Sequence, residues 1–190
     1  GPKDMNNPYN RQAFKNDVDF MFNKEIVPNQ SRYVTVNSRA VIYMWSSVQM
    51  EGDFASLLEE VKKDYPVFFL GSGEGQPNNS DGMARIKALD GFMEYGLGDR
   101  SYLRAVQNYN RVSLSLREYL RKIEVEISKK YVFIPTFQAA YDDTNFIPKR
   151  NNLPMYARSR DEVRYHAEMI KSGMGSIYDH VGPFVVYGEL

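Results

Sequence analysis

Residues 99–131 read DRSYLRAVQNYNRVSLSLREYLRKIEVEISKKY, and we expect the rest of the chain to be organised around this stretch. When successive residues are placed about 100° apart, the side chains separate into an apolar stripe and an opposite, charged stripe. The pattern predicts one long amphipathic helix that forms the spine of the protein. The apolar stripe consists of Tyr102, Ala105, Val106, Tyr109, Val112, Leu116, Tyr119, Leu120, Ile123, Ile127 and Tyr131.

The opposite face of this helix carries a row of cations. Arg100, Arg104, Arg111, Lys122 and Lys129 line up on it and span about 43 Å at 1.5 Å per residue. Such a row suits a run of phosphates, and each contact would release counterions from a nucleic acid. Lys149 and Arg150 would extend the surface if the polar loop that carries them folds back over it. The alternative interpretation is the ordinary charged face of an amphipathic helix.

The charges are balanced over the whole chain but unevenly distributed along it. The 190 residues contain 24 basic and 24 acidic side chains, so the net charge is zero. Residues 1–99 hold 10 basic and 14 acidic groups (−4), whereas residues 100–165 hold 13 and 7 (+6). The positive charge is therefore concentrated in the segment that contains the predicted helix, which favours a polyanion as ligand.

Hydrophobic periodicity predicts helices along most of the chain. We expect them after Phe14, over Ala40–Met50 as a buried central helix, after the N-cap Asp53 until Pro66, and from Ser80 or Asp81 to the glycines near Gly96. Ser159 and Glu162 form a capping box that opens a further helix. Tyr33–Val36 and VFIPTF (132–137) are short, marginal strands, and the 176–190 tail either pairs as a strand or lies along a partner.

The predicted fold class is therefore mainly α: a single-domain, multi-helix bundle around one long amphipathic helix. Residues 1–13 would form a flexible polar arm that includes a tag remnant, Gly1-Pro2. Residues 14–175 would form the helical domain, and residues 176–190 an apolar tail.

A glycine-rich segment gives the strongest hint of an enzyme. Gly71-Ser72-Gly73-Glu74-Gly75 follows an apolar run and resembles the first motif of Rossmann-like S-adenosylmethionine-dependent methyltransferases. The resemblance implies a loop whose glycines let the backbone approach a nucleoside. Phe69 stands where that motif usually has an acidic residue, and Pro77-Asn78-Asn79 interrupts the chain before the next helix. The alternative interpretation is a surface loop.

Other candidate chemistry is sparse. Asp142-Asp143 suggests a pair of carboxylates for a divalent metal, and Glu162, His166 and the Asp179-His180 pair suggest a zinc site. A polar turn and a capping box explain these residues equally simply. The chain has no cysteine, so thiolate ligands and cysteine nucleophiles are excluded. We therefore expect no catalytic residue, metal or cofactor, and consider an enzyme the less favoured class.

Together these patterns predict a non-enzymatic, self-assembling binding protein. It would resemble a viral nucleocapsid or coat subunit in its traits, bind single-stranded RNA along the basic helix face, and associate with copies of itself through its termini. The alternatives are a protein-interaction domain excised from a larger protein and a methyltransferase-like enzyme that uses Gly71–Gly75. No apolar run is long enough to span a membrane, and the absence of cysteine predicts the cytoplasm or another reducing compartment.

Overall fold

The computed structural model describes residues 4–72, 79–93, 119, 122, 131–134, 136–137, 140–141, 156–157, 159–173 and 186–187. The chain divides into two compact units. The first unit comprises Gly1–Phe92 with Lys129–Tyr131, and the second comprises Met93–Ser128 with Val132–Leu190.

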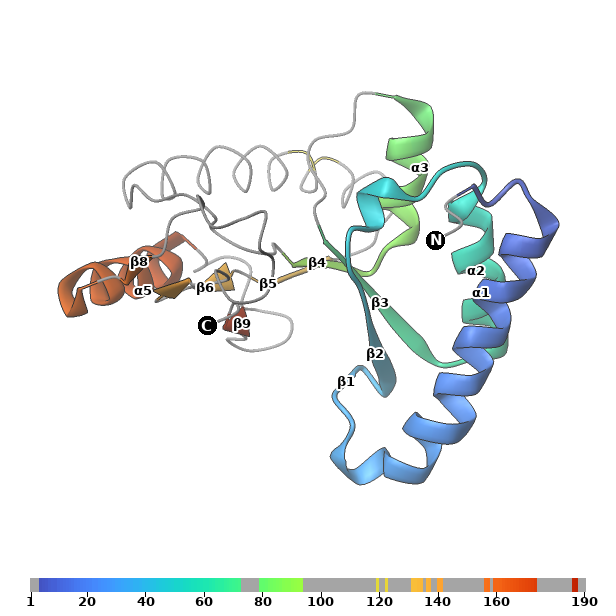
Figure 1. Ribbon diagram of the computed structural model, residues 1–190, viewed down its shortest axis with the longest axis horizontal. Helices are drawn as coiled ribbons and strands as arrows, with labels where there is room; N and C mark the ends of the chain where they lie inside the picture. Colours follow the sequence, from blue (N-terminus) through green and yellow to red (C-terminus); the bar gives the residue numbers. More distant parts are fainter. Residues whose placement is uncertain are drawn as a thin grey trace, which may run out of the picture. The chain divides into compact units, whose positions relative to one another are not determined.

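A curled, mixed β-sheet with helices replaces the expected bundle (Figure 1). Its strands follow the order β1 (Thr35–Val36), β2 (Arg39–Met44), β3 (Val67–Ser72), β4 (Gly91–Met93) and β5 (Val132–Ile134). β1 and β2 are antiparallel, whereas β2 and β3 are parallel with Ala40 opposite Val67 and Met44 opposite Gly71. The prediction of a mainly α, single-domain bundle is therefore wrong.

The error originates in the apolar run that begins at Ala40. We interpreted Ala40–Met50 as a buried helix because it is apolar nearly all round, but Arg39–Met44 is β2 and Ser47–Gln49 is a single 3₁₀ turn, η3. Strands of a parallel sheet are covered on both faces, so they too read as continuous apolar runs. The helix expected from Ser80 likewise stops at Ala88, and Gly91–Met93 continues as β4.

The helices of the first unit begin at side chains suited to capping. In α1 (Pro8–Phe20) the Asn7 side chain accepts a hydrogen bond from the Tyr9 amide, and Pro8 occupies the first turn. Asp53 caps α2 (Phe54–Asp64) as predicted, and α2 ends just before Pro66. Asn79 caps α3 (Ser80–Ala88) by accepting a hydrogen bond from the Gly82 amide at 2.7 Å.

α1 begins inside the segment that we expected to be a flexible arm. After Phe20 the helix continues as a π-helical segment, η1 (Met21–Ile26), and then as 3₁₀ turns, η2 (Val27–Arg32). Asn37 and Ser38, both with positive φ, form the tight turn between β1 and β2.

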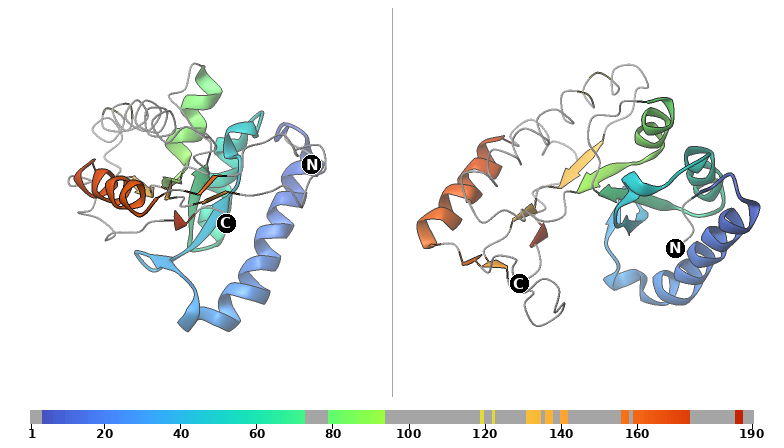
Figure 2. Two further views of the ribbon diagram at one scale, coloured as in Figure 1. Left: turned by 60° about the vertical axis from the view of Figure 1, so that its left-hand side comes forward. Right: turned by 45° about the horizontal axis from the view of Figure 1, so that its top comes forward.

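α1 and α2 lie on the same side of β2 and β3 (Figures 1 and 2). The Phe14 ring of α1 lies 5.8 Å from the ring of Phe54 in α2 and 6.3 Å from that of Phe69 in β3. The largest fully buried side chains gather from these helices, from β3 and from the segment around α3: Phe54, Phe69, Phe92, Leu57, Leu58, Ile86 and Leu89. These contacts form the hydrophobic core of the first unit.

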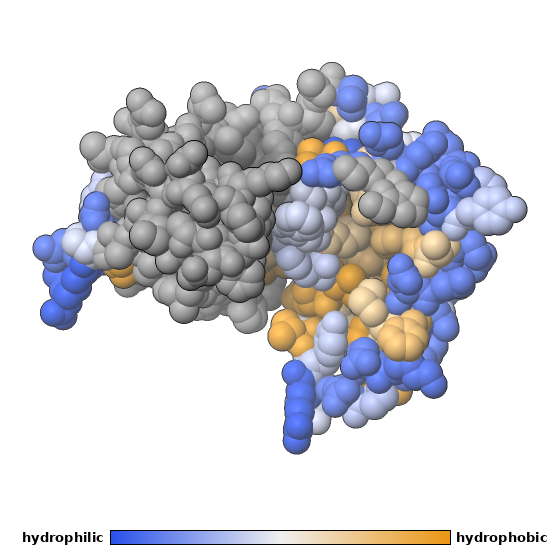
Figure 3. All heavy atoms as spheres, in the orientation of Figure 1, coloured by the Kyte–Doolittle hydropathy of each residue, from blue (hydrophilic) through white to orange (hydrophobic). Residues whose placement is uncertain are grey.

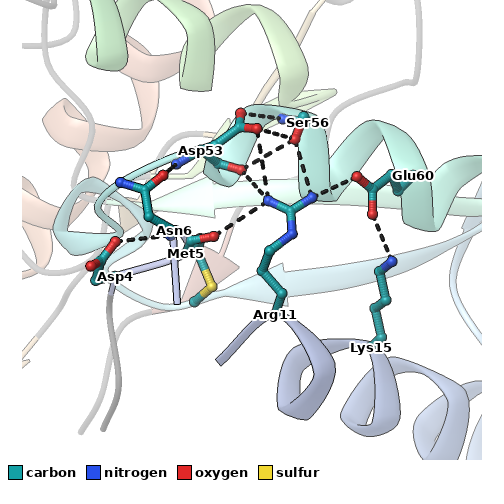
Figure 4. A network of polar contacts seen from close by, with 8 residues as sticks. All are labelled: Asp4, Met5, Asn6, Arg11, Lys15, Asp53, Ser56 and Glu60. Carbon is teal, nitrogen blue, oxygen red and sulfur yellow. Dashed lines mark hydrogen bonds and ion pairs between the residues drawn. The ribbon is translucent and has the colours of Figure 1, made fainter. Parts of the chain in front are cut away.

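A polar network joins α1 to the start of α2 (Figure 4). The Arg11 guanidinium donates hydrogen bonds to the Asp53 carbonyl (2.9 Å), the Ser56 hydroxyl (3.2 Å) and the Glu60 carboxylate (2.6 Å). Lys15 adds an ion pair with Glu60 at 2.6 Å.

In the second unit the described elements are short, apart from one helix. β6 (Thr136–Phe137) pairs in parallel with β9 (Val186–Tyr187), so the C-terminal tail contributes a strand, one of the two possibilities predicted. β7 (Ala140–Tyr141) pairs antiparallel with β8 (Tyr156–Ala157). α5 (Arg160–Gly173) opens with the predicted capping box, in which Glu162 accepts from the Ser159 amide (2.7 Å) and Ser159 accepts from the Glu162 amide (3.3 Å).

The long helix predicted over residues 99–131 lies almost entirely outside the described residues. Tyr119 and Lys122 within it are helical. In the part of the chain that the structure describes, no helix has the length and apolar character to cross a membrane.

Candidate functional site

The carboxyl ends of β2 and β3 form the best-defined candidate site. The two strands are parallel and in register, so Met44 at the end of β2 lies opposite Gly71 near the end of β3. Both chains therefore leave the sheet at the same edge. In barrels and open sheets built from alternating strands and helices, ligands bind at this edge.

Three serines fix the turn that follows β2. The Ser46 amide donates to the Ser72 hydroxyl (2.8 Å), and the Ser72 amide donates to the Ser47 hydroxyl (3.1 Å). The Ser47 hydroxyl in turn donates to the Ser72 carbonyl (3.2 Å), and the Ser72 hydroxyl donates to the Met44 carbonyl (3.3 Å). Ser47 and Ser72 are fully buried, so this network satisfies polar groups that would otherwise be costly to bury.

A glycine lets the turn approach the sheet this closely. A Cβ atom on Gly71 would lie 2.7 Å from the Ser47 hydroxyl oxygen and 2.8 Å from Cδ1 of Leu89. Both distances are shorter than real Cβ contacts, so a larger residue would push η3 or the end of α3 away from β3. Gly71 therefore lets Ser47 and Leu89 lie close against β3, a packing role within the strand.

The turn presents Trp45 to solvent. Ser46, the next residue, has φ 55° and ψ 40°, a left-handed conformation that residues other than glycine rarely adopt. Such strained residues persist where the surrounding contacts fix them, and they cluster at functional sites. Trp45 is 64% exposed, although large aromatic residues are usually covered. The site thus holds a flat apolar ring, with one N–H donor, on a turn that is fixed by hydrogen bonds.

Tyr43 lies two residues before Trp45 and is also partly exposed. Burial raises the pKa of its phenol, and a hydrogen bond with the Ser72 side chain partly offsets this rise. The phenol therefore stays protonated at neutral pH and can donate or accept a hydrogen bond. No acidic residue occurs within Met44–Met50 or Gly71–Ser72, so these described strand ends offer apolar and hydroxyl contacts.

The residues predicted to bind nucleic acid are mostly outside the described part of the chain. Lys122 is helical and exposed. The placement of Arg100, Arg104, Arg111, Lys129, Lys149 and Arg150 is not described, so neither their grouping nor their role is tested. Asp142, Asp143, Asp179 and His180 also lie outside the described residues, and Glu162 is engaged in the capping box. Within the described ranges, no group of three or more His, Asp or Glu side chains is arranged to hold a metal ion.

Sequence reasoning missed Trp45 as a site residue, since we placed this tryptophan in a buried helix. The sequence does contain a signal for this site. The run AVIYM (40–44) fits a strand, and Trp45 and the dipeptide Ser46-Ser47 follow it directly. A tryptophan directly after a buried strand is at the edge where parallel sheets bind ligands.

The fold is similar to that of solved glycoside-hydrolase-like structures. A structure described as "Glycoside hydrolase-like protein" matches 93% of this chain and 50% of its own length, with a TM-score of 0.57 and 14% identity. The GH99 endo-alpha-mannosidase from Bacteroides thetaiotaomicron matches 93% of this chain and 48% of its own, with a TM-score of 0.56 and 13% identity. This chain therefore spans about half the length of these structures. No protein-family model and no curated protein matches the sequence.

These neighbours overturn the function inferred from sequence. The prediction of a nucleocapsid- or coat-like, RNA-binding structural protein depended on a helical bundle, whereas the sheet and its solved neighbours belong to a glycoside-hydrolase-like fold. The two alternatives, an excised interaction domain and a methyltransferase-like enzyme, are likewise corrected, because the solved neighbours have a glycoside-hydrolase-like fold. In addition, Gly71 and Ser72 belong to β3, so the supposed glycine loop is partly strand.

Proposed function

We propose that this chain binds carbohydrate at the carboxyl ends of β2 and β3, with the Trp45 ring as the surface on which a sugar stacks. The observation that carries the proposal is the exposed indole held on a hydrogen-bonded turn. A pyranose presents C–H groups on its ring face and hydroxyl groups at its rim. A flat aromatic ring complements the face, and nearby hydroxyl groups such as that of Tyr43 complement the rim.

The fold likeness supports a carbohydrate over other ligands with a flat face. Both neighbours named above are described by words for glycoside hydrolysis, and each has a fold of which this chain matches about half. Their low identity to this chain supports the fold alone, so the choice of ligand depends on the site. The lack of cysteine is compatible with the cytoplasm or another reducing compartment, and this stays a prediction.

Hydrolysis is the second candidate, and the order of residues along the chain favours it. β3, which lies in a parallel pair, is followed two residues later by Glu74. Most glycoside hydrolases use two carboxyl groups on either side of the bond that breaks. Glu74 would supply one of these groups; it lies outside the described residues and is named from its position in the sequence.

The experiment uses the fact that Trp45 is the single tryptophan of the chain. Fluorescence excited at a wavelength that tyrosine does not absorb therefore reports on the proposed site alone. We expect α-linked manno-oligosaccharides, or another oligosaccharide in a panel of gluco-, xylo- and chito-oligomers, to change its emission in a saturable way. Titration calorimetry of Trp45→Ala should show affinity lowered by about tenfold or more. Trp45→Phe keeps a stacking ring and should retain most of the affinity.

The matched control is Tyr9→Ala, which removes an aromatic ring that is 85% exposed in the first turn of α1. It should bind with wild-type affinity. If no oligosaccharide in the panel changes the emission or gives heat, the proposal is wrong. It also fails if Trp45→Ala and Tyr9→Ala bind equally well. Reducing ends released in the same samples would establish hydrolysis in addition to binding.

A further inference from the structure

The connection between β2 and α2, residues 45–53, begins with the proposed sugar site and ends with the cap of α2. Trp45 is exposed at its start, and the Met50 amide closes the turn that follows by donating to the Ser47 carbonyl at 3.0 Å. A connection that carries a binding group can place that group only as precisely as it is itself fixed. The serine network fixes the first part of this connection, so the position of Trp45 also depends on what holds the second part.

The segment before α1 lies along the second part of the connection (Figure 4). Asp4 and Glu51 form a parallel β-bridge, and the Met5 amide donates to the Glu51 carbonyl at 2.9 Å. The Asn6 side-chain oxygen accepts a hydrogen bond from the Asp53 amide at 3.0 Å. We name Asp4, Met5 and Asn6 the N-terminal clasp, because they hold the connection through both backbone and side-chain hydrogen bonds.

The fit between the N-terminal clasp and the connection is close at Gly52. Its φ of 69° is a left-handed conformation that favours glycine. A Cβ atom on Gly52 would lie 2.7 Å from the Asn6 amide nitrogen, so a larger residue would push the N-terminal clasp away. Arg85 of α3 adds a hydrogen bond to the Met50 carbonyl at 3.3 Å. Two separate segments of the chain therefore hold the end of the connection.

We infer that Asn6 is a positioning residue for the proposed sugar site and acts on Trp45 through the β2–α2 connection. Its effect on affinity rests on the proposed function. The hydrogen bond from Asp53 to Asn6 ties the connection at the end opposite Trp45. Without this bond the turn would open more often, and the Trp45 ring would adopt more orientations. Sugar binding would then have to order the turn, at a cost in affinity.

The test variant is Asn6→Ala, and Asn7→Ala is its matched control. Both side chains are exposed, and hydrophilic side chains cover the outer side of the first unit, where α1 lies (Figure 3), so neither change disturbs the core. Each change removes one hydrogen bond from a backbone amide: that of Asp53 to Asn6 (3.0 Å), or that of Tyr9 to Asn7 (2.9 Å). Only the bond to Asn6 reaches the connection.

The first measurement needs no sugar. Hydrogen exchange of individual amides, followed by NMR, reports how often the turn opens at Gln49 and Met50, whose amides bond to carbonyl groups at the start of the turn. In Asn6→Ala these two amides should exchange about threefold faster or more, whereas in Asn7→Ala they should exchange at the wild-type rate. The Phe69 amide of β3 should exchange equally in the two variants, which verifies that the opening is local. A wild-type rate at both turn amides in Asn6→Ala overturns the inference.

The second measurement is titration calorimetry with the same panel of manno-, gluco-, xylo- and chito-oligomers. Asn6→Ala should bind about threefold to tenfold more weakly than the wild type, and Asn7→Ala should bind equally well. Equal affinities of the wild type and Asn6→Ala overturn this inference alone, because the proposed function then stands without it. If no member of the panel binds the wild type, the proposed function is wrong, and the inference is overturned with it.

Discussion

Two charged clusters hold the first unit together, and they differ chiefly in burial. Asp90, just before β4, is 4% exposed; it pairs with Arg39 of β2 at 3.0 Å and with Lys62 of α2 at 3.3 Å. The Arg11 cluster instead joins α1 to α2 at the surface, through Asp53 and Glu60 carboxylates that are half-exposed. Both clusters connect segments that are far apart in sequence. Because water weakens charge interactions at the surface, an ion pair of the Arg11 cluster should stabilise the protein less than a pair of the same length in the Asp90 cluster.

The Asp90 cluster also includes backbone groups. The Asp90 carboxylate accepts from the Phe69 amide at 2.9 Å, and the Asp90 amide donates to the Phe69 carbonyl at 2.9 Å. Lys62 donates to the Ala88 carbonyl, and the Arg39 guanidinium lies 4.9 Å from the centre of the Phe68 ring. This one carboxylate therefore fixes the end of α3 against β3 and α2. The Arg11 cluster instead positions the N-terminal helix against α2.

Removing the buried carboxylate should have the largest effect. Asp90→Ala removes the buried anion that Arg39 and Lys62 share, so that Lys62 keeps its pair with Glu59, and it leaves the Phe69 amide without its carboxylate acceptor. We expect it to lower the free energy of unfolding by about 3–5 kcal/mol, measured by urea denaturation. Asp90→Asn keeps the size and an acceptor oxygen, and should fall between the wild type and Asp90→Ala.

The control for this prediction is Asp17→Ala, which removes an exposed carboxylate from α1. Its effect on the free energy of unfolding should stay within about 0.5 kcal/mol. If Asp90→Ala were as mild as Asp17→Ala, burial would not be what distinguishes the two clusters.

Within the surface cluster, a second comparison separates a half-buried cation from an exposed one. Arg11→Ala removes hydrogen bonds to Asp53, Ser56 and Glu60 from a side chain that is 20% exposed, and should lower the free energy of unfolding by about 1–2 kcal/mol. Lys15→Ala removes one pair between side chains that are both about two-fifths exposed, and should cost less than about 1 kcal/mol. If urea denaturation showed equal losses in the free energy of unfolding for the two variants, neither burial nor the number of contacts would determine how much a cation of this cluster stabilises the protein.

The sequence predicted local features better than contacts between distant segments. The Asp53 cap, the Ser159–Glu162 capping box and the end of α2 before Pro66 depend on neighbouring residues, and all are confirmed. The Arg39–Asp90 pair joins residues 51 positions apart, and the Arg11–Glu60 pair joins residues 49 apart. No local pattern encodes such pairs, because either residue alone resembles an ordinary surface charge.

The prediction of the fold class was wrong at a segment whose sequence pattern is shared by two kinds of secondary structure. A short apolar run such as Ala40–Trp45 fits both a buried helix and a buried parallel strand, and periodicity cannot choose between them. The choice depends on β3, whose equally apolar run pairs with it. The candidate site was missed for the same reason. Trp45 was placed inside a buried helix, whereas β2 ends at Met44 and Trp45 is exposed on the turn that follows.

The smallest expected effect is a change in the acid sensitivity of the surface cluster. The hydrogen bond from Lys15, followed by the charge of Arg11, lowers the pKa of Glu60 below its ordinary value of 4.5. The hydrogen bond from the Ser56 side chain similarly lowers the pKa of Asp53 below 3.8. A carboxyl group whose pKa is lower in the folded state stabilises the protein fully above its unfolded pKa, and this contribution disappears as pH falls through the folded pKa.

Glu60→Gln should therefore reduce the loss of stability that the wild type shows as pH falls below 4.5, measured as the shift in urea midpoint between pH 7 and about pH 3. Lys15→Ala should reduce it as well, because removing the donor returns the pKa of Glu60 toward its ordinary value. Both changes should be modest, since the side chain of Glu60 is half-exposed and water screens its interactions. If both variants showed the same shift in urea midpoint as the wild type, Glu60 would not contribute to the acid sensitivity of the fold. The surface cluster would then stabilise the protein through the hydrogen bonds of Arg11 rather than through its charges.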